Sequence, residues 1–197
     1  VYLTGGRAKG ADHDHEGARN DAPPIADGPV VFGTNICFVG HSARWNGAPA
    51  FLEHRAAATG ALGRRYLITL EQFADVHAQE NRIRPGGLEF PDDILDLAPG
   101  QQQMVIDGAY GAVVALDPVN GHPTFTFTAP TPPEQRPPAA PSAPYLATIL
   151  HGLREIHDLD DNLIVERVAH APGVRPNWSS TAMHQLLDTP LSEISST

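Results

Sequence analysis

The fold depends most on the stretch Leu67-Ile68-Thr69-Leu70-Glu71-Gln72-Phe73-Ala74-Asp75-Val76-His77-Ala78-Gln79-Glu80. Its pattern predicts the end of a strand that runs directly into a helix. Thr69 is a preferred N-cap residue and Gln72 stands three positions later, so the two predict a capping box. Because an α-helix turns by about 100° per residue, Phe73, His77 and Glu80 fall on one face of this helix.

Glu80 is the unusual residue of this helix, because its carboxylate falls on the apolar face, where the helix should pack. Glu71 and Asp75 lie off that face, where charge is expected. A buried charge is costly unless it is paired or neutralised through a raised pKa, and a raised pKa suits a general acid or base. Glu80 is therefore the candidate catalytic residue. The structural alternatives are that the helix ends before Glu80, or that Arg82 or Arg84 pairs with it.

Composition limits the classes of protein to which the chain can belong. It has 197 residues, of which 41% are hydrophobic, which suits one domain with a core and room for an appendage. The formal net charge is −10 and no basic patch stands out, which argues against nucleic acid or an anionic membrane as partner. No apolar run is long enough for a transmembrane helix.

Cysteine usage points to a reducing compartment. Cys37 is the single cysteine and lies in an apolar run, so a disulfide framework is excluded and a cytoplasmic location is expected. A reactive thiol needs an exposed, electropositive setting, so we interpret Cys37 as a core residue rather than a nucleophile.

The remaining elements predict an α+β or α/β domain with a mixed sheet, curled into a small barrel. Residues 4–29 read as a long loop. The clearest pattern is the hairpin of residues 113–116 and 124–128, joined by a turn over residues 117–122. A helix should begin at 143 or 144 with Ser142 as its cap and end at 157, and a second should be capped near Asp160 or Asp161. The tail from His170 shows little periodicity. Other strands are expected at residues 36–39, 48–53, 64–68 and 104–106, and the first strand of the hairpin should span residues 110–116. A short helix is expected at residues 91–97.

Other chemistries have weaker support. His13, His15 and Glu16 are metal-type ligands, but adjacent ligands on a flexible segment make a poor preformed site. A metal-dependent hydrolase built on these three residues nevertheless stays an alternative. The chain has no nucleophile elbow, no glycine-rich phosphate loop that opens a helix, and no CxxC or HExxH motif.

Three stretches resemble the γ-glutamylcyclotransferase-like superfamily. Residues 66–73, followed by Gln79-Glu80, resemble the region around that superfamily's catalytic glutamate. Residues 42–48 are similar to its Trp-x-Gly-Gly loop, with alanine in place of the second glycine. Residues 141–145 are similar to its Pro-Ser-x-x-Tyr helix start. The three stretches lie in the family's order and extend the resemblance over residues 30–159.

The likeness is strongest to a bacterial subgroup of small proteins, some of which carry the label histone deacetylase. This chain lacks the ligand constellation of a zinc deacetylase. The superfamily opens with a strand and a Tyr-Gly-Ser-Asn loop that binds the carboxylate end of the substrate. Residues 32–35, Phe-Gly-Thr-Asn, are followed by another strand, so they lack the context of an anion-binding loop. We expect the motif to precede Val1, which would make the chain an N-terminally truncated fragment.

The resemblance implies a γ-glutamylcyclotransferase-like domain over residues 1–159, with a proline-rich strap at 129–144 and a packing helix at 145–159. Residues 160–197 would form a C-terminal helix and tail. The implied activity is that of a lyase or acyltransferase that cyclises a γ-glutamyl amine to a lactam without a metal or organic cofactor. Glu80 would be the general acid/base, and the substrate would be bound by Trp45, Asn46, Gly47 and Tyr145.

A non-catalytic member of the same fold, which binds a small amine or a protein partner, is the remaining alternative.

Overall fold

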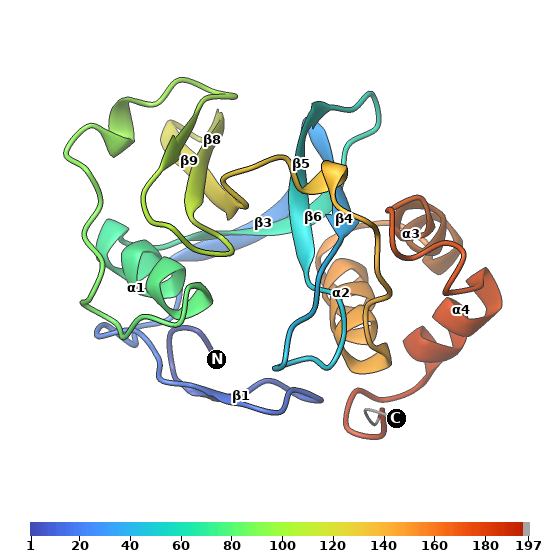
Figure 1. The fold of residues 1–197 in the computed structure, drawn as a ribbon. Helices are drawn as coiled ribbons and strands as arrows, with labels where there is room; N and C mark the ends of the chain where they lie inside the picture. The colour runs from blue at the N-terminus through green and yellow to red at the C-terminus, as the bar shows by residue number, and fades with distance from the viewer. Residues whose placement is uncertain (195–197) are drawn as a thin grey trace. The chain divides into compact units, whose positions relative to one another are not determined.

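The computed structural model describes residues 1–194 (Figure 1). The chain divides into two compact units, each made of several segments. The first, the α1 unit, contains Val1–Gly6, His15–Pro23 and Ile68–Pro132. The second, the α2 unit, contains Arg7–Asp14, Pro24–Leu67 and residues 133–194. The short strands β1 (Gly6–Arg7) and β2 (Asp14–His15) pair with each other.

The α1 unit packs one helix and a three-stranded antiparallel sheet. Its elements are α1 (Leu70–Glu80), the 3₁₀ turn η1 (Ile94–Asp96), β7 (Gln102–Met104), β8 (Ala112–Val119) and β9 (His122–Thr128), with strand order β7-β8-β9. The capping box is confirmed, because the Thr69 hydroxyl accepts from the Gln72 amide and the Gln72 side chain accepts from the Thr69 amide. This cap fixes where α1 begins.

Aromatic rings hold α1 to the sheet. The Phe73 ring packs against Phe90, Phe125 and Phe127, with ring centroids 5.3 to 6.2 Å apart. The His77 ring stacks on Phe90 and Phe127. The predicted hairpin is confirmed, and its turn is tighter than expected, because β8 continues to Val119 and only residues 120 and 121 adopt positive φ. Asparagine and glycine tolerate that conformation.

The α2 unit combines two short antiparallel strand pairs with three helices. Its elements are β3 (Ala26–Val31), β4 (Thr34–Phe38), β5 (Ala50–Ala56), β6 (Leu62–Leu67), the 3₁₀ turn η2 (Pro133–Gln135), α2 (Ala143–Ile156), α3 (Asp161–Ala169) and α4 (Ser180–Asp188). Strand β3 pairs with β6, and β4 pairs with β5. The three helices share one apolar core with Phe38, which includes Leu150, Ile164 and Met183.

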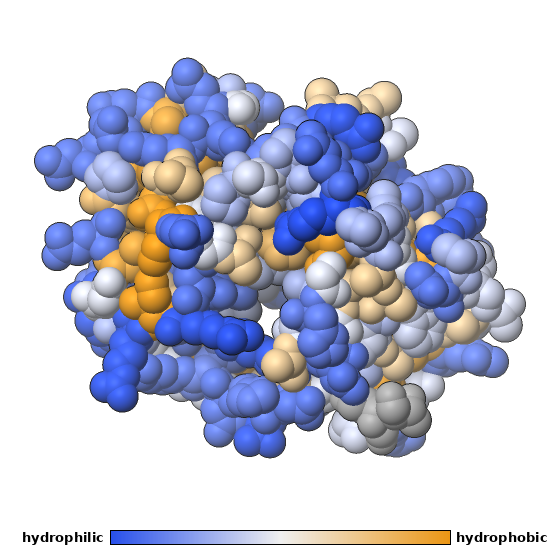
Figure 2. Space-filling view, viewed as in Figure 1, coloured by the Kyte–Doolittle hydropathy of each residue, from blue (hydrophilic) through white to orange (hydrophobic). Residues whose placement is uncertain are grey.

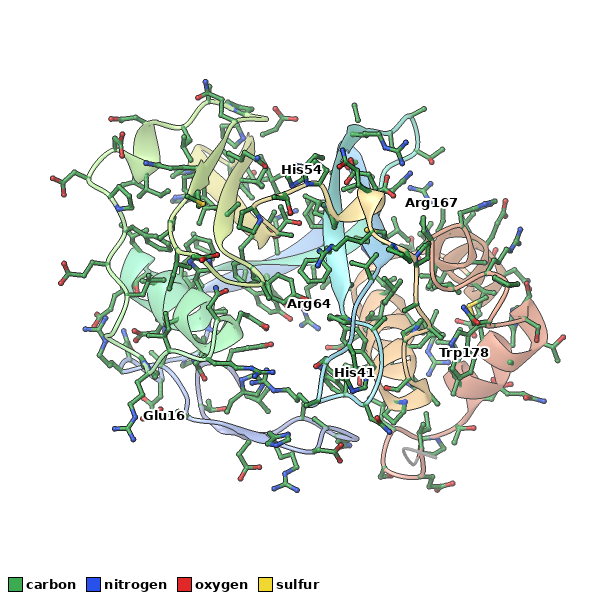
Figure 3. All side chains as sticks on the ribbon, viewed as in Figure 1. Glu16, His41, His54, Arg64, Arg167 and Trp178 are labelled. Carbon is green, nitrogen blue, oxygen red and sulfur yellow. The ribbon has the colours of Figure 1, made fainter. Side chains whose placement is uncertain are left out.

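Polar contacts fix the edges of the α2 unit (Figure 3). The Arg64 guanidinium pairs with Asp27 on the neighbouring strand and with Glu155 on α2, the latter at 3.1 Å. The Trp178 indole donates to the Pro141 carbonyl at 3.1 Å, which holds the proline-rich strap next to the start of α2. Strand β6 and the strap are therefore both fixed by side chains that lie far from them in the sequence.

The α+β class is confirmed, but two details of the prediction are wrong. The sheets are antiparallel rather than mixed, and residues 1–194 form no closed barrel. The predicted loop at residues 4–29 contains β1, β2 and the start of β3. The domain limits at 159 and 160 stay a prediction. No helix within residues 1–194 has the length and apolar character needed to cross a membrane.

The sequence predicted the start of α3 correctly but did not predict α4. Helix α3 begins as expected, because the Asp160 side chain accepts from the Leu163 amide. Ser142 has the extended backbone of an N-cap, but its hydroxyl makes no capping bond. Helix α4 was missed, although Ser179 caps it and Met183 and Leu187 are spaced to share one buried face. Figure 2 shows hydrophilic residues over most of the visible face, with apolar side chains confined to smaller patches.

Candidate functional site

Glu80 is the last residue of α1, and Asn81 is its C-cap. The helix therefore does not end before Glu80. The Asn81 amide N–H remains bonded to the last turn, 3.0 Å from the Ala78 carbonyl oxygen and 3.2 Å from that of His77. The first structural alternative for Glu80, an early end of the helix, is wrong.

The Glu80 carboxyl group is enclosed without being paired. The residue keeps partial access to solvent, yet the protein around the carboxyl group raises its pKa from 4.5 to about 7, and desolvation is the only cause. Within residues 1–194 it makes no hydrogen bond or ion pair, so neither Arg82 nor Arg84 neutralises it. The second structural alternative is therefore also wrong. A carboxyl group with a pKa near neutrality can both accept and release a proton at physiological pH.

A clamp between α1 and the loop before β8 fixes the end of the helix that carries Glu80. The Asn81 side chain donates to the carbonyls of Tyr110 and His77, at 3.2 and 3.0 Å, and accepts from the Tyr110 amide at 3.1 Å. The His77 Nε2 atom lies 2.5 Å from the Tyr110 carbonyl oxygen. Gly108 is required here, because a Cβ atom at this position would lie 2.2 Å from Asn81 Oδ1. No sequence pattern predicted this clamp, because its two sides are 29 residues apart in the chain.

Asp75 contradicts the expectation that it faces solvent. Its side chain is completely buried and accepts from the Arg19 amide at 2.9 Å, the Arg19 Nε atom at 3.1 Å and the Gly86 amide at 2.7 Å. Desolvation raises the pKa of Asp75, but the hydrogen bonds from Arg19 and Gly86 outweigh it, so the pKa is lowered overall. Asp75 is thus an ionised structural anchor, whereas Glu80 on the same helix forms no ion pair with any of the described residues.

Trp45, Asn46 and Gly47 lie in the α2 unit, in the loop between β4 and β5. A backbone hydrogen bond of 2.8 Å from Ser42 to Gly47 closes the loop. Asn46 adopts a positive φ of 49°, which asparagine tolerates better than most residues. Gly47 lies so close to the start of α2 that a Cβ atom would be 2.4 Å from the Ser142 nitrogen.

Tyr145, in the first turn of α2, contacts this loop. Its ring centroid lies 4.9 Å from that of Trp45, and its hydroxyl accepts from the Ala50 amide at 3.3 Å. The Ser142 hydroxyl is enclosed nearby and has no hydrogen-bond partner within residues 1–194. The structure therefore brings Trp45, Gly47 and Tyr145 together. Glu80 belongs to the other unit.

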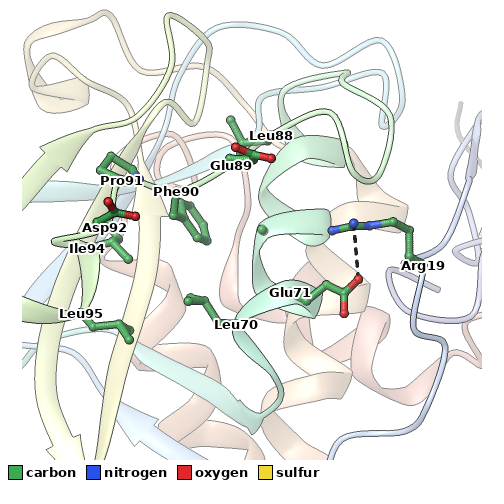
Figure 4. A pocket seen from close by; sticks show the side chains of 11 residues that line it. Arg19, Leu70, Glu71, Leu88, Glu89, Phe90, Pro91, Asp92, Ile94 and Leu95 are labelled. Carbon is green, nitrogen blue, oxygen red and sulfur yellow. Dashed lines mark ion pairs between the residues drawn. The ribbon is translucent and has the colours of Figure 1, made fainter.

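The α1 unit also contains an open groove of about 370 Å³ (Figure 4). The groove involves the first turns of α1, where Leu70, Glu71 and Ala74 lie roughly 80° or more around the helix from Glu80. It is therefore a separate site, and no sequence pattern indicated it. The lining residues are Arg19, Leu70, Glu71, Ala74, Leu88, Glu89, Phe90, Pro91, Asp92, Ile94 and Leu95.

His13, His15 and Glu16, the predicted metal ligands, do not form a metal site with other described residues. In the described part of the chain, no group of three or more such side chains is arranged to hold a metal ion. The buried His15 ring packs edge-on against Tyr2, at 4.0 Å between centroids. The position of Glu16 is shown in Figure 3.

Comparisons of the chain with protein-family models, with curated proteins and with solved structures give no significant match. Membership of the γ-glutamylcyclotransferase-like superfamily therefore rests on the three motifs, and it is carried forward as a proposal.

The isolated Glu80 carboxyl group predicts an unusual pH dependence of stability. Because its pKa is raised from 4.5 to about 7, the folded chain binds this proton more tightly, and the free energy of unfolding falls as pH rises between these values. We expect Glu80→Gln to stabilise the chain by up to about 3 kcal/mol above pH 7, with the gain disappearing toward pH 4.5. Urea unfolding of the wild type and the variant across this pH range measures the difference in their free energies of unfolding.

Glu166→Gln is the matched control, because Glu166 is an exposed glutamate on helix α3. It should change stability little at any pH. A Glu80→Gln variant that is no more stable than the wild type at high pH would contradict the isolation of this carboxyl group.

Proposed function

We propose that the chain is a γ-glutamylcyclotransferase-type enzyme that releases an amine from a γ-glutamyl amine and closes a five-membered lactam. The observation that carries the proposal is the Glu80 carboxyl group, with a pKa of about 7 and no partner within residues 1–194. It ends a helix whose sequence resembles the family's catalytic region. General acid–base catalysis is most efficient when the catalytic pKa lies near the working pH.

In the proposed reaction, Glu80 is the only protein group that gains and loses a proton. Its carboxylate takes a proton from the α-amino nitrogen of the substrate, and that nitrogen forms a bond to the γ-carbonyl carbon. The bond between this carbon and the amine nitrogen then breaks, and the proton passes from Glu80 to the leaving amine. Nucleophile and carbonyl belong to one molecule, so the ring closes with a high effective molarity and without a metal or organic cofactor.

The clamp at Asn81 supports this role, because a general base must be held in a defined position relative to its substrate. The Asn81 side chain makes bonds to both polar groups of the Tyr110 backbone, so the last turn of α1 is fixed on the neighbouring loop. The backbone that carries Glu80 is therefore held in place, while the Glu80 side chain makes no hydrogen bond or ion pair to the described part of the chain.

We assign substrate binding to Trp45, Asn46, Gly47 and Tyr145. The packing of Trp45 on Tyr145 supports a shared role, because two aromatic rings in contact can bind the apolar part of a small ligand. The close approach of Gly47 to the start of α2 holds the loop in this arrangement. A small molecule with a γ-glutamyl or other amine-containing group is the proposed substrate, and no nucleic acid or membrane is a proposed partner.

The test is turnover of a panel of γ-glutamyl amines by the wild-type chain, followed as lactam formation. We expect kcat/KM to rise with pH and to level off above an apparent pKa near 7, because Glu80 must be ionised to act as the base. Activity that survives exhaustive chelation would exclude the metal-dependent hydrolase. A lack of turnover across the panel would favour a binding member of the same fold.

A further inference from the structure

The groove of the α1 unit combines an apolar interior with acidic residues. Leu70, Leu88, Phe90, Ile94 and Leu95 supply its apolar lining (Figure 4). Leu70 and Leu95 remain 42% and 50% exposed, so apolar surface is left open to a ligand. Burial of such surface favours a ligand with an apolar body.

Charge in the groove is predominantly negative. Among the described residues, Arg19 is the only cation that lines the groove. Its guanidinium is already held by the buried Asp75 carboxylate and lies 3.4 Å from Glu71. The dashed line in Figure 4 marks the contact with Glu71. Glu89 and Asp92 are exposed and have no hydrogen bond or ion pair within residues 1–194. The groove therefore offers two carboxylates that make no direct hydrogen bond or ion pair to the described residues, although the Arg19 charge also attracts that of Glu89.

We propose that this groove binds a small amphipathic amine, with one cationic nitrogen and a single apolar body. The volume of about 370 Å³ lies at the lower end of the range of small-molecule pockets, which suits a ligand with one aromatic ring. The apolar body would lie against Phe90 and the leucines, and the ammonium group would lie near Glu89 and Asp92. An anion would be repelled by the same carboxylates.

The proposal is independent of the lactam-forming reaction, because none of the lining residues is Glu80 or a residue assigned to substrate binding. Each exposed ion pair contributes little to the free energy of binding, so the amine should bind weakly, with an affinity that depends strongly on ionic strength. The apolar contact should set which amines bind, and the carboxylates should set the preference for amines over neutral molecules.

Phenethylamine is the probe, and two related molecules separate its two binding features. Phenethyl alcohol keeps the ring without the charge, and methylamine keeps the charge without the ring. Titration at low salt would be followed through the NMR signals of isotope-labelled leucine and isoleucine methyl groups. We expect saturable shifts at Leu70, Ile94 and Leu95 with phenethylamine, and binding about threefold to tenfold weaker for either related molecule.

Two exposed substitutions test the carboxylates without disturbing the core. The double variant Glu89→Gln/Asp92→Asn should weaken phenethylamine binding by about threefold to tenfold, whereas Asp96→Asn, an exposed carboxylate outside the groove, should leave it unchanged. Leu95→Ala should also weaken phenethylamine binding, whereas Glu80→Gln should leave this binding unchanged. Equal binding by phenethyl alcohol, an unaffected double variant, or methyl shifts that do not saturate would each overturn the proposal.

Discussion

Glu80→Gln is expected to lower kcat/KM for lactam formation by about 10²–10⁴-fold, the usual contribution of a general acid–base group. Glutamine preserves the size and shape of the side chain but cannot take a proton from the attacking nitrogen. Because the carboxyl group makes no ion pair in the described chain, the substitution breaks no structural contact. The loss should appear in kcat with a smaller change in KM, measured with the most active γ-glutamyl amine of the panel.

The matched control is again Glu166→Gln, which changes an exposed carboxylate on α3 and should retain wild-type kcat and KM. Far-ultraviolet circular dichroism and the unfolding transition would show that the Glu80→Gln variant is folded. A folded variant with an undiminished rate would exclude Glu80 as the base. Loss of activity together with the expected gain in stability would separate catalysis from folding, because the two effects have opposite signs.

Asp75→Asn is expected to destabilise the chain by about 2–4 kcal/mol near pH 7, because it removes hydrogen bonds to a buried carboxylate while its guanidinium partner stays half exposed. The Asp75 carboxylate accepts from two backbone amides and from the Arg19 guanidinium, with no exposure of its own. An asparagine amide would direct donor hydrogens at groups that are themselves donors. Urea unfolding at constant ionic strength would measure the loss.

Glu71→Gln is the control for this prediction, because Glu71 contacts the same Arg19 guanidinium from a half-exposed position. The Glu71→Gln substitution should lower the free energy of unfolding by less than about 1 kcal/mol. The pKa of Asp75 is lowered from 3.8, so its contribution is fully present above that value and is lost as pH falls through the lower folded value. The difference between wild type and Asp75→Asn should therefore shrink in strong acid, and a difference that is unchanged there would contradict the assignment.

Local features could be predicted because neighbouring residues determine them. The Thr69–Gln72 capping box, the hairpin between β8 and β9 and the Asp160 cap depend on side chains only a few positions apart. The signal for α4 was also local, with a serine cap followed by Met183 and Leu187, but only two apolar residues define its buried face. Such a short pattern is difficult to distinguish from an irregular tail.

Features that depend on distant segments could not be predicted. Helical periodicity assigned Asp75 to the solvent, but Arg19 and Gly86 bind its carboxylate, and neither residue belongs to a segment with an apolar pattern. Glu80 was identified because its angular position alone marks it as unusual. The Asn81 clamp and the acidic groove depend on loops at residues 86–95 and 105–111, whose positions follow from tertiary contacts.

The burial of Cys37 gives the chain an internal reporter of its own opening. The side chain has no exposed surface, and burial, followed by the charges of Glu53 and Glu134, raises the pKa of its thiol to about 12. Alkylating reagents attack the thiolate, so the native chain should be inert to them and react only when β4 separates from β5. The alkylation rate would thus follow how often the α2 unit opens, without an introduced label.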